Sequence, residues 1–175
     1  MKKPIKFYIQ RELLVKDETV KKLAEGYLEK AKDNLITLKI LSEIQDDKEF
    51  REKLDIPKDY STYEWVAITG YYAMYTAAIS LLAKIGYRSK NHSATLCVLE
   101  EFFVKMRILD EDILILLKSA MFHKKEIERL SDAKHKREIA QYSITKQTTK
   151  SIAEKIKKDA YDFVDKCDEI IDKMK

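Results

Sequence analysis

Glycine, proline and cysteine are scarce in this chain of 175 residues, which holds three, two and two of them. Strand-to-strand turns depend on glycine and proline, and a sandwich or barrel of this size needs a turn about every ten residues. The shortage therefore excludes a β-rich fold and predicts an all-α protein. Two cysteines, Cys97 and Cys167, are too few for a disulfide framework or a cysteine-rich zinc site, and they favour a reducing, cytoplasmic compartment.

Several cofactor-binding and metal-binding motifs are missing as well. The isolated glycines cannot form a Walker loop or a Rossmann fingerprint. The histidines are too far apart to share a helix face, and the chain has no Glu-x-x-His pair of the kind that holds two iron ions in a helical bundle. The sequence thus predicts no cofactor and no metal ion.

The chain also has no apolar run that fits export. Charges at Arg11 and Glu12 interrupt the N-terminus before a run of signal-peptide length. The uncharged stretch 65–83 is nearly long enough to span a bilayer, but threonine, tyrosine, glycine and serine make it too polar for a lone membrane helix. We predict that it is the central buried helix of a soluble bundle, with no role in a membrane.

Apolar residues recur at spacings of three and four along most of the chain, which is typical of amphipathic helices. The expected helices span 18–44, 61–86, 92–106, 111–130 and 145–174, the last with heptad-like spacing. They predict an antiparallel bundle of four or five helices, with one domain over residues 19–175 and an N-terminal arm over residues 1–18.

The second expected helix has no charged face, so we expect other helices to surround it. Its terminal signals are a cap at Ser61 or Thr62 and a left-handed glycine at Gly86, followed by a polar loop over 88–91. The residues predicted to form its packing stripe are Trp65, Ile68, Tyr72, Tyr75, Ile79 and Leu82.

Positive charge is concentrated in the C-terminal half. Between Lys118 and Lys158 the chain has twelve Lys or Arg against five Asp or Glu, although the net charge of the whole chain is only +4. Such asymmetry is typical of a surface that faces a polyanion, and a solvated helix face is the alternative.

The window 123–142 holds the residues that metal-free cleavage of RNA would use. An arginine can grip the scissile phosphate with a bidentate fork, and a histidine can take the proton of a ribose 2′-hydroxyl. Two pairs are candidates, Arg129 with His135 and Arg137 with Tyr142, and exposed charges at a helix end are the alternative. The candidate nucleic-acid-binding residues are Lys124, Lys125, Lys134, Lys136 and Gln141.

Three segments resemble the HEPN domain family of small helical bundles. Segment 27–35 (YLEKAKDNL) resembles the opening helix of the family. Segment 71–78 (YYAMYTAA), with the following Gly86 and His92, is similar to its central helix and loop. Segment 137–142 (REIAQY), which leads into a final amphipathic helix, is similar to the motif that opens the last helix of the family.

The resemblance implies a bundle that dimerises and, in many members, a metal-independent ribonuclease whose motif is an arginine, four to six residues, then a histidine. Many such domains are toxins that pair with a nucleotidyltransferase antitoxin. Arg137 aligns with the family arginine, but the residue after a gap of four is Tyr142, whose pKa near 10 makes it a poor general base. Arg129 and His135 match the pattern literally, slightly before the last helix.

We therefore predict a HEPN-like, RNA-directed protein that is a homodimer. It is either a toxin-type, metal-independent endoribonuclease or a non-catalytic module that binds a nucleotide or a nucleotidyltransferase. An unrelated structural bundle with a solvated basic connector is the third hypothesis. His92 is expected to satisfy backbone groups at the start of the third helix, and the tyrosines at 71, 72 and 75 are expected to pack in the bundle or the dimer.

Overall fold

Helices make up most of the protein. The computed structural model describes residues 3–135 and 142–174, with described side chains over 3–127 and 150–174. The helices and strands in these ranges are α1 (Ile5–Gln10), β1 (Leu14–Lys16), the 3₁₀ segment η1 (Glu18–Leu23), α2 (Ala24–Asp46), α3 (Lys48–Lys53), α4 (Tyr63–Lys84), β2 (Tyr87–Ser89), α5 (His92–Leu99), the π-helical segment η2 (Glu100–Val104), α6 (Glu111–His135) and α7 (Tyr142–Lys173).

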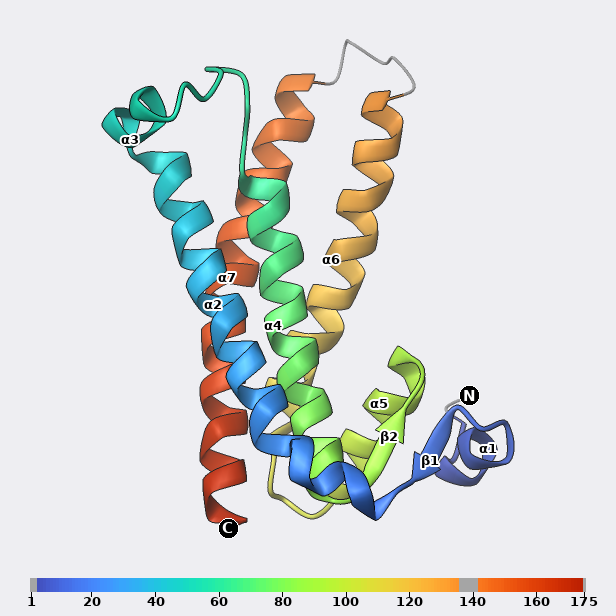
Figure 1. Ribbon diagram of the computed structural model, residues 1–175. Helices are drawn as coiled ribbons and strands as arrows, with labels where there is room; N and C mark the ends of the chain where they lie inside the picture. The colour runs from blue at the N-terminus through green and yellow to red at the C-terminus, as the bar shows by residue number, and fades with distance from the viewer. Residues whose placement is uncertain (1–2, 136–141, 175) are drawn as a thin grey trace.

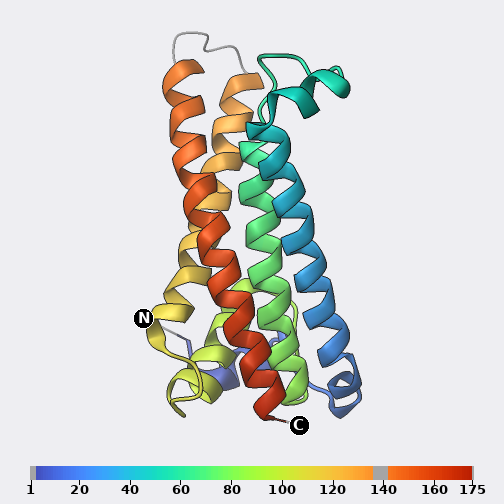
Figure 2. The ribbon, with the colours of Figure 1, turned by 90° about the vertical axis from the view of Figure 1, so that its left-hand side faces the viewer.

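The long helices α2, α4, α6 and α7 form an up-down-up-down bundle (Figure 1). Seen after a quarter turn, they run close to one common axis, with α3 beside one end (Figure 2). α4 packs against each of the other three long helices. The prediction of an all-α antiparallel bundle is confirmed, because each long helix buries its apolar side against its neighbours.

α4 is the core helix of this bundle. By length and composition it could cross a membrane, yet 67% of its most apolar 18-residue window is buried inside the protein. The small residues Ala73, Ala77 and Ala78 are completely shielded from solvent. The prediction that segment 65–83 is a central buried helix is confirmed, and packing against other helices accounts for its hydrophobicity.

Gly70 lies where α4 meets both α2 and α7. A Cβ atom added at Gly70 would lie 2.7 Å from Cγ2 of Ile156 and 2.9 Å from Cδ1 of Leu38. A hydrogen at this position therefore lets the neighbouring side chains reach the α4 backbone, which is a packing role and not a conformational one.

The packing face of α4 differs from the predicted stripe. Trp65 and Tyr72 belong to the predicted packing stripe, but they are 51% and 46% exposed, whereas Tyr71 is 1% exposed. The prediction that this stripe packs within the bundle is wrong at these two positions, and the alternative that Tyr72 packs in a dimer stays a prediction. α4 is apolar on all sides, so its spacing cannot show which side faces the neighbours; the side rich in alanine and glycine allows the closest approach.

The N-terminal segment is docked onto the bundle through a two-stranded antiparallel ladder. β1 pairs with β2, with Leu14 opposite Ser89, and the Leu14 side chain is fully buried. Gly86 has a φ of +75°, as its predicted left-handed role requires, and its carbonyl accepts a hydrogen bond of 2.8 Å from the Asp17 amide. The predicted loop over 88–91 is wrong in part, because a three-residue strand has too little periodicity to detect.

The last two helices are longer than predicted. α6 continues to His135 instead of ending at Leu130, and α7 begins at Tyr142 instead of Thr145. Both boundaries were misplaced because polar residues were interpreted as a connector, although no glycine or proline stops either helix there. The heptad-like stripe of the last helix is confirmed as buried at Ile152, Ile156, Ala160, Phe163, Cys167 and Ile170.

Candidate functional site

Most of the residues predicted to act on RNA fall, along the sequence, in the last part of α6, in the segment that follows it or at the start of α7. The side chains of Lys124 and Lys125 are described, and both residues belong to α6. The structure describes the backbone but not the side chains of Arg129, Lys134, His135 and Tyr142. Lys136, Arg137 and Gln141 lie outside the described residues. The α6 backbone carries positions 129 and 135 on one continuous helix, about 9 Å apart along its axis.

A cluster of aromatic and basic side chains lies where α4, α5 and α6 meet. It consists of His92, Tyr71, Tyr72, Tyr75, Lys124 and Lys125, and we call it the His92 cluster. The hydroxyl oxygen of the buried Tyr71 lies 3.1 Å from Nε2 and 3.3 Å from Nδ1 of His92. The Tyr75 ring meets the imidazole edge to face, with ring centroids 4.5 Å apart. Two α4 side chains thus hold the half-buried imidazole in place.

The local sequence explains why His92 is free to face α4. The Oδ1 atom of Asn91 accepts a 2.8 Å hydrogen bond from the Ala94 amide and so caps the start of α5. The Ser89 hydroxyl donates to the Asn91 carbonyl oxygen at 2.8 Å. Because Asn91 provides the cap, the prediction that His92 satisfies the helix start is wrong, and its imidazole turns to Tyr71 instead.

Two lysines of α6 complete the cluster. The Lys124 Nζ lies 5.5 Å from the Tyr71 ring centroid and 5.8 Å from the Tyr72 ring centroid, a cation–π arrangement. Lys125 is exposed. Burial, and then the positive charges of Lys124 and Lys125, lower the pKa of His92 from its ordinary value of 6.5. The imidazole is therefore neutral at pH 7.

This arrangement combines two chemical properties. The ammonium groups and the imidazole provide hydrogen-bond donors for an anion, and the exposed Tyr72 ring provides a face for stacking. Among the described side chains, no group of three or more His, Cys, Asp and Glu residues is placed to hold a metal ion.

Comparison with known proteins places the chain in a family. Over 126 residues it is 33% identical to a UPF0332 protein of Archaeoglobus fulgidus, and the match covers 70% of this chain and 90% of that relative. This chain belongs to the UPF0332 family. No family model matches it, and no solved structure matches it.

Sequence reasoning found only part of the cluster in this UPF0332 protein. It selected Lys124 and Lys125 from the charge pattern, but it assigned His92 and the tyrosines to capping and packing. No spacing rule connects His92 with Tyr71 or Lys124, because the three residues come from different helices. The available signal was a lone histidine that follows an aromatic-rich helix.

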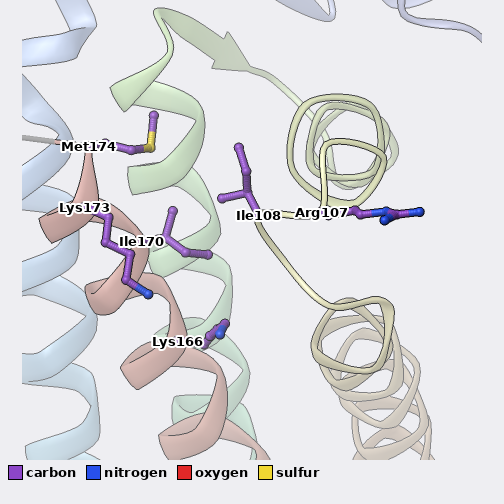
Figure 3. Close-up of a pocket in the computed structure, with 6 residues that line it drawn as sticks. All are labelled: Arg107, Ile108, Lys166, Ile170, Lys173 and Met174. Carbon is purple, nitrogen blue, oxygen red and sulfur yellow. The ribbon is translucent and has the colours of Figure 1, made fainter.

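A separate cavity lies at the end of the UPF0332 bundle where α7 ends, between the last turns of α7 and the turn before α6 (Figure 3). Its volume is about 350 Å³, and it is lined by Arg107, Ile108, Lys166, Ile170, Lys173 and Met174. Lys166 lies 3.6 Å from a Glu169 carboxylate oxygen and 3.9 Å from one of Asp110, while Arg107 points away from the other lining side chains in this view (Figure 3). The cavity thus has an apolar wall without converging polar groups, and it shares no lining residue with the His92 cluster.

Proposed function

We propose that this UPF0332 protein is a HEPN-like protein that acts on RNA. The observation that carries the proposal is the position of Lys124 over the rings of Tyr71 and Tyr72, beside His92. Proteins that bind single-stranded RNA combine cations for the backbone with aromatic rings for the bases. The helical bundle and the three HEPN-like segments support the same assignment.

The charge distribution supports RNA as the polyanion. Lys124 and Lys125 belong to the stretch with twelve basic against five acidic residues, which continues along α6 and into α7. RNA binding through such a surface releases condensed counterions, so its affinity falls steeply as the salt concentration rises. Lys125→Gln is expected to lower both the RNA affinity and the slope of its salt dependence, which a fluorescence anisotropy titration at several salt concentrations measures.

We further propose that the RNA-directed activity is metal-independent cleavage. An arginine, Arg129 or Arg137, would hold the scissile phosphate. His135 would take the 2′-hydroxyl proton in the first pair, and Tyr142 would orient the substrate in the second. The 2′-oxygen would attack the phosphorus while the P–O5′ bond breaks, and the leaving 5′-oxygen would take a proton from water or from protonated His135, which gives a 2′,3′-cyclic phosphate and a 5′-hydroxyl end.

Cleavage of a mixed RNA pool in the presence of chelator tests this activity. The wild-type protein is compared with Arg129→Ala, His135→Ala, Arg137→Ala and Tyr142→Ala, and Lys30→Ala at an exposed position of α2, outside the basic stretch, is the control. Loss of cleavage in one arginine variant and in its partner variant, with an active control, identifies the pair. Absence of cleavage by the wild-type protein refutes the catalytic proposal and favours the binding module, whose partner would be a nucleotidyltransferase or a nucleotide.

The exposed end of α4 favours a protein contact in addition. Trp65 is 51% exposed, Ile68 one turn later is half-buried, and the stretch 65–83 carries no charge. We propose that a second copy of this chain packs here and forms a homodimer. Light scattering should give the mass of a dimer for the wild-type protein and of a monomer for Trp65→Lys; the same mass for both would refute this interface.

A further inference from the structure

The His92 cluster has a feature that binding to an RNA backbone does not require. Tyr71 and Tyr75 hold the His92 imidazole, and the Lys124 ammonium lies over the ring of the same Tyr71. We propose that the cluster binds a terminal phosphate monoester, on a nucleotide or on an RNA end, through His92, Lys124 and Lys125. This inference rests on the proposed RNA-directed function and adds the chemical class of the ligand.

The first argument is the hydrogen-bonding capacity of His92. The Tyr71 hydroxyl can pair with one ring nitrogen at a time, although it lies within 3.3 Å of both. The second nitrogen is then available to a ligand, and the imidazole is only half-buried. Since Tyr75 stacks edge to face on the ring, the imidazole keeps its orientation with no ligand bound. When the Tyr71 hydroxyl donates to one ring nitrogen, the N–H lies on the other, and this preorganised donor loses little entropy on binding.

The second argument is charge. The Lys124 ammonium lies 5.5 Å from the ring centroid of Tyr71, whose hydroxyl contacts the His92 ring, and Lys125 is the next residue of α6. A phosphate monoester carries between one and two negative charges at pH 7, whereas each backbone diester carries one. Two ammonium groups and one imidazole therefore match a terminal monoester better than an internal diester.

The third argument is the position of Tyr72. Its ring is 46% exposed and lies beside the same Lys124 ammonium. A nucleoside whose phosphate is held by Lys124 can thus place its base on the Tyr72 ring. Such stacking accepts any base, so the structure assigns the phosphate end and not the base identity.

Bound phosphate should also change the protonation of His92. The groups that face its imidazole are Tyr71 and Tyr75 from α4 and the two lysines from α6. Without ligand, the lysines oppose protonation of the ring. A bound phosphate offsets their charge, so we expect binding to raise the pKa of His92 from its value in the free protein.

The test follows the His92 ring signals by NMR on the full-length protein, assigned with His92→Gln, during titrations with adenosine monophosphate, adenosine and inorganic phosphate. We expect the monophosphate to move the His92 signals and to bind at least about tenfold more tightly than adenosine, the gain expected for a charge-assisted hydrogen bond. Lys124→Gln and Lys125→Gln should each remove most of this gain, and Lys30→Gln, at an exposed position of α2 outside the basic stretch, should leave it unchanged. Lys125 is exposed, so its substitution does not disturb the core.

Equal affinities for adenosine and its monophosphate, or His92 signals that do not move, would overturn the inference. Oligoribonucleotides with and without a terminal phosphate separate it from the proposed function. If both oligonucleotides bind equally and independently of Lys124, the RNA-directed function stands and the phosphate site fails. If the monophosphate binds at His92 but neither oligonucleotide binds, the phosphate site stands and the RNA-directed function fails.

Discussion

Gly70→Ala separates helix propensity from tertiary packing. Propensity alone predicts that alanine stabilises α4 by about 1 kcal/mol, because glycine is the poorer helix former. The structure predicts the opposite sign, since the new Cβ would lie 2.7 Å from Cγ2 of Ile156 and 2.9 Å from Cδ1 of Leu38. The Leu38 atom ends a flexible side chain, but Cγ2 branches directly from Cβ of Ile156, and because isoleucine strongly prefers one χ1 rotamer in a helix, it moves at a cost or with a shift of α7. Overpacking of this kind costs about 1–3 kcal/mol, so we expect a net loss of about 1 kcal/mol.

Urea denaturation followed by circular dichroism measures the free energy of unfolding of this variant. Gly26→Ala is the matched control, because a Cβ at this exposed position of α2 has no neighbour within 4 Å. The control should gain about 1 kcal/mol, which makes the two variants differ by about 2 kcal/mol. In an Ile156→Ala background the Cγ2 atom is absent, so Gly70→Ala should lose most of its cost.

The two glycine variants can refute the packing argument. If Gly70→Ala stabilises the protein as much as Gly26→Ala does, the close approach of α7 to α4 at Gly70 is wrong. If its cost is the same with Ile156 and with alanine at that position, the cost does not come from the Cγ2 contact.

Three further outcomes follow from the same structure. Burial, and then two lysines, lower the pKa of His92 in the folded protein below its ordinary value of 6.5, so the unfolded state binds more protons. The urea midpoint should therefore fall as the pH is lowered from about 7.5 to about 5.5, and it should fall less in His92→Gln. Asn91→Ala removes the 2.8 Å cap on the Ala94 amide and should cost about 1 kcal/mol in the same urea assay, whereas an unchanged midpoint would show that the cap contributes nothing. Burial raises the pKa of the Cys167 thiol, so a thiol reagent should label half-buried Cys97 in the native protein and reach Cys167 only after denaturation, as mass spectrometry of the peptides would show.

Periodicity predicted the fold well where one side of a helix is polar. The last helix alternates charged and apolar residues, and every stripe position from Ile152 to Ile170 is buried as expected. In α4 the same method failed for Trp65 and Tyr72, since the uncharged stretch 65–83 has no charged side to mark its solvent face. The ladder between β1 and β2 was missed because each strand has three residues and pairs with a partner more than seventy positions away.

The candidate site, too, was predictable from the sequence only in part. Charge counting selected Lys124 and Lys125, because clustered charge is a property of composition and needs no coordinates. The role of His92 depends on Asn91 capping α5 and on Tyr71 reaching the imidazole from α4, contacts between residues up to 21 positions apart. Local turn chemistry can place a cap at either residue, and only the packed helices select one.

The order of residues along the chain is thus sufficient for the class of fold, the left-handed turn at Gly86 and the concentration of positive charge between Lys118 and Lys158. These properties depend on spacing, on backbone preference and on total charge, all of which act over a few neighbouring residues. The solvent face of α4, the close packing at Gly70 and the meeting of His92 with Tyr71 and Lys124 required the folded protein. Each depends on contacts between side chains that are far apart in the sequence, and the arrangement that packs most closely is the most stable.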